Sequence, residues 1–480
     1  MNIRQAKNEI KHTVEAYLKK DEAGDYEIPE IRQRPVLLMG PPGIGKTQIM
    51  EQIARELGVG LVAYTITHHT RQSAVGLPFI REEEFAGKTY SVTEYTMSEI
   101  IASVYRRIRD SGQREGILFI DEINCVSETL APTMLQFLQC KTFGNQKIPE
   151  GWVIVASGNP PEYNKSVRDF DMVTLDRVRY MTVEADYRVW KEYARAQHIS
   201  GAILSYLELR PGNFYRVEAD VDGMQFVTAR GWEDLSNLMA VYEKLGFLVD
   251  EQVIREYIHH ADVAEDVAAY LDLYRKYQDD YGIPQILDGC VRPEIYARIY
   301  AAAFDERLSV VHLLLDGLAA FFGRAASERA LTDAWYTFLK EYRSQVETAA
   351  DPAECYRTLV AEREQEMLRQ IANDAYTREE AKREKLLMEK LKAAQQEVTK
   401  DSAQRCFEAA GAALEHAFDF MEQAFENGEE MVVFVTELTI TSESARFLSE
   451  HTCERYLTYN KQLLIGTRRA ELLSELRRDN

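Results

Sequence analysis

The sequence predicts an α/β domain built on a parallel sheet, followed by an all-α region. Two apolar runs carry the first part of this prediction: Val36–Met39 leads into a glycine-rich loop and a helix, and residues 117–120 are four large apolar residues in a row. Such runs are typical of strands that are covered on both faces. After Asp186 apolar residues recur at helical spacing, so we expect helices only from there onward.

The loop after the first strand has the spacing G-x-x-x-x-G-K-[ST]. A strand before it and a helix after it are the context in which this spacing forms a phosphate site. Glycines let successive backbone N–H groups converge on one anion, and the start of the next helix adds positive charge. The alternative is a Pro/Gly turn that carries a lysine by chance. We expect a nucleotide to contact Gly40, Pro41, Pro42, Gly43, Ile44, Gly45, Lys46, Thr47 and Gln48.

Two carboxylates, Asp121 and Glu122, follow the apolar run at 117–120. In a parallel sheet they would lie at the carboxyl edge, where such sheets bind ligands. We expect Thr47 and Asp121 to hold Mg²⁺, and Glu122 to orient and polarise an attacking water. Asn159 follows another buried strand, at 152–157, and could contact the γ-phosphate or the water. The alternative is that Asn159 only forms a turn before Pro160.

Several arginines are candidates for neutralising the negative charge of the bound phosphates. Arg168, Arg177 and Arg179 could each complete the site of a neighbouring subunit, or form a surface ion pair. Arg230 begins a helix after the sheet and would face back across the nucleotide cleft, so that closure depends on bound phosphate.

Shorter segments complete the predicted α/β part. We expect a strand at 60–66, hairpins at 79–95 and 141–151, and helices at 98–109 and 124–140. His68 and His69 follow the strand at 60–66 and suggest a metal site. A polar loop is the better interpretation, because neighbouring side chains on a strand point to opposite faces.

Composition narrows the classes of function. The 480 residues carry a formal charge of −21, which argues against a nucleic-acid partner, because such binding relies on clustered Lys and Arg. The six cysteines form no C-x-x-C pair, so we expect reduced thiols and a cytoplasmic protein. No apolar run approaches the ~18 residues of a membrane span.

Taken together, these motifs resemble the AAA+ ATPases, and within them the MoxR-like and dynein-related branch. The matching residues are the Walker A loop at 40–47, the Walker B strand at 117–122, a sensor-1-like Asn159, an arginine-finger segment with Arg177, and a sensor-2-like Arg230. Residues 84–97 are similar to the helix-2 insert of that branch, and 141–150 to its pre-sensor-1 hairpin. The finger segment reads Val-Thr-Leu-Asp-Arg-Val-Arg at 173–179, which leaves Arg179 as a competitor of Arg177.

The resemblance implies ATP and Mg²⁺ as cofactors and a homo-oligomeric ring, commonly of six subunits. It also implies ATP-driven remodelling of a protein partner, and MoxR-like ATPases are often paired with a protein that has a von Willebrand factor A domain. Two alternatives stay open: an ATP-gated scaffold with little turnover, and a nucleic-acid-stimulated motor. ATP rather than GTP is the family default, since a loop that reads phosphates does not select the base.

These inferences give four segments. Residues 1–33 form an N-terminal helix and connector, 34–185 the nucleotide-binding core, 186–285 a helical lid, and 286–480 an all-α region. Within the last, alternating charge over about 354–400 predicts one long helix, either a solvated helix or an interaction arm. Residues 431–438 fit a helix or a strand, and we choose a helix.

Overall fold

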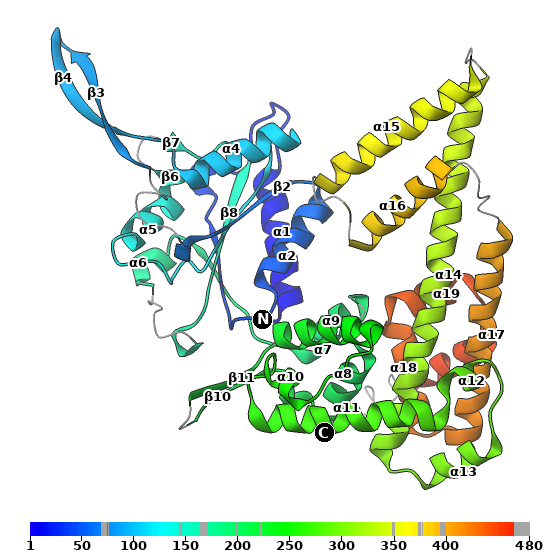
Figure 1. The fold of residues 1–480 in the computed structure, drawn as a ribbon. Helices are drawn as coiled ribbons and strands as arrows, with labels where there is room; N and C mark the ends of the chain where they lie inside the picture. The colour runs from blue at the N-terminus through cyan, green and yellow to red at the C-terminus, as the bar shows by residue number, and fades with distance from the viewer. Residues whose placement is uncertain are drawn as a thin grey trace, which may run out of the picture. The chain divides into compact units, whose positions relative to one another are not determined.

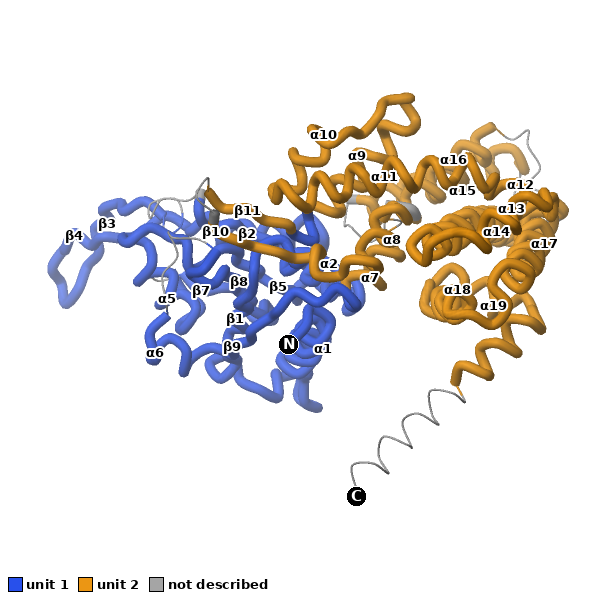
Figure 2. Tube along the Cα trace, turned by 90° about the horizontal axis from the view of Figure 1, so that it is seen from below, with its two compact units in different colours: residues 1–189, 228–230 blue, residues 190–227, 231–480 orange. Residues whose placement is uncertain are grey.

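The structure is a computed structural model that describes residues 1–68, 74, 76–143, 146–163, 170–197, 199–220, 223–347, 351–372, 376, 378–393 and 400–464. The chain divides into two compact units, coloured separately in Figure 2. Unit 1 contains Met1–Val189 and Thr228–Arg230, and unit 2 contains Trp190–Val227 and Gly231–Asn480. The predicted boundary near residue 186 lies close to the first division, whereas the predicted lid and C-terminal region fall in the same unit.

Unit 1 is built on a five-stranded parallel sheet with the strand order β2-β5-β8-β1-β9. Its central strands are almost completely buried, which confirms the parallel α/β sheet expected from their apolar runs. The loop after β1 and the carboxylates that end β5 lie at the same edge, because all five strands run in one direction. The strands are β1 (Val36–Met39), β2 (Gly60–Thr65), β5 (Gly116–Asp121), β8 (Trp152–Gly158) and β9 (Arg179–Thr182).

Helices and two hairpins surround this sheet. Helix α1 packs on α2, and its buried residues Ala6, Ile10 and Val14 are spaced at one helical face. The hairpin of β3 and β4 extends from unit 1 as a two-stranded ribbon (Figure 1). The elements are α1 (Ile3–Leu18), α2 (Lys46–Leu57), β3 (Pro78–Phe85), β4 (Lys88–Tyr95), α4 (Glu99–Ser111), α5 (Ala131–Cys140), β6 (Thr142–Phe143), β7 (Gln146–Lys147) and α6 (Met172–Leu175), with single turns at Glu30–Arg32, Ile66–His68 and Pro161–Tyr163.

One helix of unit 1 is shorter than predicted. The expected helix at 124–140 begins only at Ala131, and turns occupy the residues before it. Pro132 explains this start, because proline lacks the N–H of an interior helical residue and fits the first turn.

Unit 2 is mostly helical. Its longest element is α14 (Phe304–Val346), which packs against α8, α11, α17, α18 and α19. The other helices are α7 (Tyr187–Ala196), which starts in unit 1, α8 (Gly201–Leu209), α9 (Ala229–Leu245), α10 (Glu251–Arg255), α11 (Ala261–Tyr281), α12 (Ile283–Leu287), α13 (Pro293–Ala301), α15 (Pro352–Ala372), α16 (Arg378–Ala393), α17 (Lys400–Phe425), α18 (Glu429–Ile440) and α19 (Ser442–Glu450), with a single turn at Pro211–Asn213.

Three expectations for unit 2 are wrong. Strands do not stop at Asp186, because β10 (Arg216–Asp220) and β11 (Gly223–Val227) pair as an antiparallel hairpin. Residues 250–281, for which the apolar spacing predicts one helix, instead form α10 and α11 with a break between them. The charged segment at 354–400 is not one helix: α15 and α16 fold back on each other, as the bonds Tyr356–Leu391 and Arg363–Glu384 show. The helical choice for 431–438 is confirmed by α18.

Among the described residues, only α14 is long and apolar enough to cross a membrane by length and composition. Its most apolar window is 56% buried inside the fold, and core helices of water-soluble proteins give the same pattern.

Candidate functional site

The glycine-rich loop lies between β1 and α2 and has the backbone that its sequence predicts. Gly43 and Gly45 have φ angles of 73° and 92°, which favour glycine, and Gly45 caps the N-terminus of α2. Gly40 is needed for a different reason, since a Cβ there would lie 2.8 Å from the carbonyl oxygen of Val183. The loop therefore follows the edge of the sheet closely and presents the start of α2 to a ligand.

The Lys46 side chain connects the loop to the end of β8. Its ammonium group donates to the carbonyl oxygens of Gly40 and Pro41 at 2.7 and 2.8 Å, and to Oδ1 of Asn159 at 2.8 Å. Burial lowers its pKa to about 8, with a further contribution from Arg230 and an opposing one from Asp121. An anionic ligand near this ammonium would compensate the cost of burying its charge.

Asp121 joins the loop to the second motif. Thr47 Oγ1 lies 3.1 Å from Asp121 Oδ2, although 74 residues separate them in the chain. The other carboxylate oxygen accepts from the Ser157 hydroxyl on the adjacent strand β8 and from the backbone N–H of Glu122 at 2.9 Å. The carboxylate is thus fixed on one side and turned toward the threonine on the other.

Glu122 has an unusual backbone. Its φ angle is 59°, in the left-handed region that residues with a Cβ rarely adopt. Its Oε2 accepts from Thr67 Oγ1 at 2.9 Å. Thr67 is a site residue that the sequence reasoning missed. Thr65 pairs with Asp121 in the parallel register, so the turn after β2 and the residue after β5 were bound to meet.

Asn159 is held from behind by Asn124. The side-chain nitrogen of Asn124 donates to the carbonyl oxygen of Asn159 at 2.8 Å, and its Oδ1 accepts from the Asn159 N–H at 3.3 Å. Asn124 is only 3% exposed, which fixes this arrangement. The Asn159 side chain accepts from Lys46, and its contact with the γ-phosphate or the water stays a prediction.

The predicted arginines have different surroundings. The backbone N–H of Arg230 donates to the Gly43 carbonyl oxygen at 3.1 Å, and its exposed side chain is close enough to lower the pKa of Lys46. Arg177 is exposed and donates to Gln139. Arg179 instead donates to Thr13 Oγ1 at 2.6 Å and pairs with Glu9, both on α1. Arg168 lies outside the described residues.

The residues present fit a magnesium nucleotide. A hydroxyl and a carboxylate 3.1 Å apart are oxygen ligands of the kind that Mg²⁺ prefers, with phosphate and water oxygens filling the rest of its shell. Within the described part of the chain, no group of three or more His, Cys, Asp or Glu side chains could hold a metal ion by itself. The side chain of His68 and all of His69 lie outside the described residues. The interpretation of these histidines as part of a polar loop therefore stays a prediction.

Comparison with known proteins identifies this region. Residues 35–178 match the family described as AAA domain (dynein-related subfamily). These residues form an AAA domain of that subfamily. A segment of 94 residues is also 35% identical to the ATPase family gene 2 protein homolog B of Bos taurus, covering 19% of this chain and 10% of that protein.

An AAA domain implies nucleotide binding. Its matched range includes the glycine-rich loop, both carboxylates, Asn159 and Arg177, and excludes Arg230 and unit 2. The match to the bovine protein spans about a tenth of that protein's length, so its name describes that protein only.

Proposed function

We propose that the chain is an Mg²⁺-dependent ATPase that converts ATP and water to ADP and phosphate. The observation that carries this proposal is the meeting of two distant motifs: Lys46 with Asn159 at 2.8 Å, and Thr47 with Asp121 at 3.1 Å. Bound ATP·Mg²⁺ would supply the reacting phosphoryl group and most of the charge neutralisation.

Each residue then has a defined task. Lys46 binds the β- and γ-phosphates, and Thr47 and Asp121 hold the metal ion. Glu122 orients and polarises the attacking water, with Thr67 setting the direction of its carboxylate. Asn159 positions the water or the γ-phosphate, and Arg230 binds phosphate from the helix that enters unit 2. The loop residues Gly40, Pro41, Pro42, Gly43, Ile44, Gly45 and Gln48 surround the phosphates.

The finger residue is Arg177 rather than Arg179 in this proposal. Arg179 is engaged with Glu9 and Thr13 of its own α1, whereas Arg177 is exposed and its guanidinium group donates to the side chain of Gln139. An exposed arginine can reach the site of a neighbouring copy, where it would add about 10³–10⁵ in rate. This assignment requires a homo-oligomeric ring, for which we propose six subunits.

We further propose that this ring remodels or activates a protein partner in the cytoplasm, as MoxR-like ATPases do. A partner with a von Willebrand factor A domain is the first candidate. The alternatives are an ATP-gated scaffold with little turnover and a nucleic-acid-stimulated motor. The presence of Asp121, Glu122 and a finger candidate favours turnover over gating, and the charge of −21 disfavours nucleic acid.

The decisive experiment compares two variants in a phosphate-release assay. Glu122→Gln should retain ATP binding and lose about 10²–10⁴-fold in turnover, while Lys46→Ala should lose binding itself. Glu83→Gln, in the β3–β4 hairpin away from the site, is the matched control and should behave like the parent. Parent-like hydrolysis in both site variants would refute the assignment of these residues.

Three further measurements separate the alternatives. Turnover per subunit that rises with protein concentration supports sites shared between copies, and negligible turnover at every concentration supports the scaffold. Stimulation by DNA or RNA would restore the nucleic-acid motor. Co-purification with tagged Glu122→Gln protein in the presence of ATP would identify the partner.

A further inference from the structure

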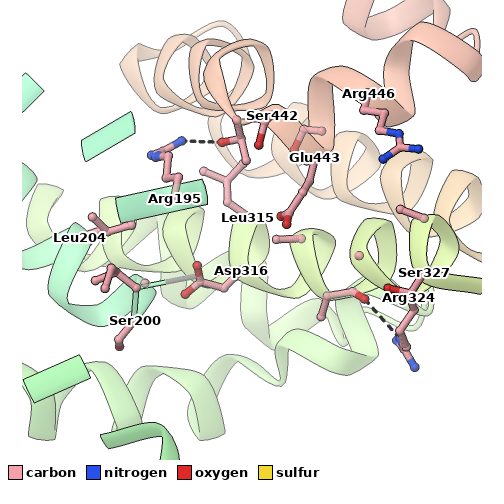
Figure 3. A pocket seen from close by; sticks show the side chains of 18 of the residues that line it. Arg195, Ser200, Leu204, Leu315, Asp316, Arg324, Ser327, Ser442, Glu443 and Arg446 are labelled. Atoms are coloured by element: carbon pink, nitrogen blue, oxygen red, sulfur yellow. Dashed lines mark hydrogen bonds between the residues drawn. The ribbon is translucent and has the colours of Figure 1, made fainter. Parts of the chain in front are cut away.

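A cavity of about 670 Å³ lies within unit 2, and all residues that line it fall outside the matched range 35–178. Side chains of α7, α8, α14, α16 and α19 line it (Figure 3). Its volume is in the range of small-molecule sites, about 300–1,000 Å³. The proposal below uses unit 2 alone and does not depend on the proposed ATPase activity.

One stripe of α14 forms the floor of this cavity. The lining residues of α14 recur three or four positions apart, which places them on one face of the helix. In the middle of the stripe Ala319, Ala320 and Gly323 leave space that larger side chains would fill. A Cβ added at Gly323 would have no atom within 4 Å. The hollow is therefore a product of small residues on a continuous helix rather than of a break in the fold.

Hydrogen-bond acceptors gather at one end of the stripe. Asp316 accepts from the Tyr274 hydroxyl at 2.9 Å and lies against the start of α8, where only Gly201 leaves room for it. His312 is 3% exposed, and its Nδ1 lies 2.9 Å from the Leu308 carbonyl oxygen. Burial lowers the pKa of His312 to about 4, so the neutral ring donates from Nδ1 and offers Nε2 as an acceptor. That Nε2 has no hydrogen-bond partner among the described residues.

Positive charge gathers at the other end. Arg324 lies eight residues beyond Asp316, or about 12 Å along the helix axis, and its Nε donates only to a backbone carbonyl, that of Ala320. Arg383 of α16 and Arg446 of α19 also line the cavity, and neither forms an ion pair with a described side chain.

The two ends are separated in space. Figure 3 shows Asp316 with Arg195 and Ser200 on one side, and Arg324 with Arg446 on the other. The carboxylate of Glu443 points between them from the first turn of α19. Thr441, the residue before α19, accepts a hydrogen bond from Arg195 at 2.7 Å, so the start of this helix lies on the Asp316 side of the cavity.

We propose that this cavity binds a small phosphate ester that carries hydroxyl groups, such as a sugar phosphate. The phosphate would lie between Arg383 and Arg446, which present planar arrays of donors suited to phosphate oxygens. The hydroxyl groups would donate to Asp316 and His312. A ligand with phosphate alone would leave those acceptors unused, and a ligand with hydroxyls alone would leave the arginines unpaired.

The test is isothermal titration calorimetry on protein that carries Lys46→Ala, so that the loop at 40–47 contributes no phosphate binding. The probes are ribose 5-phosphate, ribose and inorganic phosphate. We expect ribose 5-phosphate to bind at least about tenfold more tightly than either of the others, because only it reaches both ends of the cavity.

Two variants then locate the binding. Arg383→Gln combined with Arg446→Gln should weaken ribose 5-phosphate binding by at least about tenfold, since two charge-assisted hydrogen-bonding groups are removed. Gly323→Leu should abolish it by filling the hollow, in a helix that tolerates leucine better than glycine. The matched control is Arg405→Gln, an exposed arginine of α17 that does not line the cavity, and it should bind like the parent.

Each contrary result overturns the proposal. Undetectable heat with all three probes up to ~10 mM would exclude the site. Equal affinity for ribose and ribose 5-phosphate would exclude the role of the arginines, and equal affinity for inorganic phosphate would exclude the acceptor end. Parent-like binding by Gly323→Leu would place the ligand elsewhere.

Discussion

At the scale of single residues, Glu122 combines a catalytic assignment with a strained backbone. Its φ of 59° costs about 1 kcal/mol for a residue with a Cβ, and little for glycine. Glu122→Gly should therefore unfold with a free energy about 1 kcal/mol higher than Glu122→Ala, although both variants remove the same carboxylate. Urea unfolding of the two proteins, followed by a probe in unit 1, measures this difference.

The comparison has an internal control. Glu51 lies in the interior of α2 and is exposed. At that position the Gly variant should be less stable than the Ala variant by about 1 kcal/mol. This order is the opposite of the one expected at position 122. The same order at both positions would mean that the backbone of Glu122 is not strained.

The two arginines at 177 and 179 should respond differently to truncation. Arg177→Ala removes an exposed side chain and should reduce hydrolysis by about 10³-fold or more with little change in stability. Arg179→Ala breaks the contacts with Glu9 and Thr13, and should lower the free energy of unfolding by about 1 kcal/mol while hydrolysis changes far less. Phosphate release and thermal unfolding of both variants decide the assignment, and the reverse pattern would make Arg179 the finger.

Motif spacing predicted most of the residues that meet at the site, but not their supports. Lys46, Thr47, Asp121 and Asn159 come together as expected. Thr67, Ser157 and Asn124 were not foreseen, because a single hydroxyl or amide at a strand end has no pattern of its own. Their positions follow only from the strand order, in which β2 and β8 flank β5.

At the scale of elements, the α15–α16 hairpin is fixed by an apolar seam against α14. Leu387 is fully buried in the cluster that α14, α15 and α16 share, while the adjacent Leu386 is 44% exposed. Leu387→Ala should cost about 2–5 kcal/mol and speed hydrogen exchange throughout both helices. Leu386→Ala, one position away, should leave exchange near the parental rate, and similar effects of both would mean that the hairpin is a solvated arm after all.

Helix α14 also predicts a pH dependence. The folded protein holds His312 with a pKa of about 4, below its usual 6.5, because burial opposes its charge. Between these values the unfolded chain binds a proton that the folded protein does not, so stability is lost as the pH falls. From about pH 7.5 to 5 this loss amounts to about 2 kcal/mol.

His312→Leu should remove that loss. Denaturant unfolding of unit 2 should show the variant gaining stability relative to the parent as the pH falls from about 7.5 to 5. The raised pKa of Asp316, about 6, acts in the opposite direction in both proteins, since a carboxyl that keeps its proton stabilises the folded state at low pH. A pH-independent difference between variant and parent would show that His312 is not held neutral by burial.

The sequence predicted elements well where apolar residues follow one period, and poorly where turns decide the outcome. Buried strands such as β5 and amphipathic helices such as α4 lie where expected. The hairpin of β10 and β11 was missed because its two strands are only five residues long and mix polar with apolar residues. The fold-back of α15 on α16 was missed because alternating charge indicates only that a helix has a solvated face. It does not indicate where the helix ends.

At the scale of the whole molecule, the path of the chain connects the nucleotide site with unit 2. The residues that meet around Lys46 all belong to unit 1, including Arg230, which the chain contributes after passing through unit 2. The chain thus leaves the nucleotide site, returns to it for three residues, and enters the helical unit again through α9. The chain crosses between the units after residues 189, 227 and 230, so a change at the phosphates would reach unit 2 through three covalent connections.

If hydrolysis takes place between copies, mixing two inactive variants should restore it. Arg177→Ala protein retains Glu122, and Glu122→Gln protein retains Arg177, so a site formed by the first with its neighbour from the second contains both groups. Random mixing in equal amounts gives this combination at about one quarter of the interfaces, so turnover should return to about a quarter of the parental rate.

The control mixture combines Glu122→Gln protein with a double variant that carries both Lys46→Ala and Arg177→Ala. This mixture should restore no turnover, because no site then holds Lys46 and Glu122 together. Phosphate release that stays at background in the first mixture would mean that each copy completes its own site.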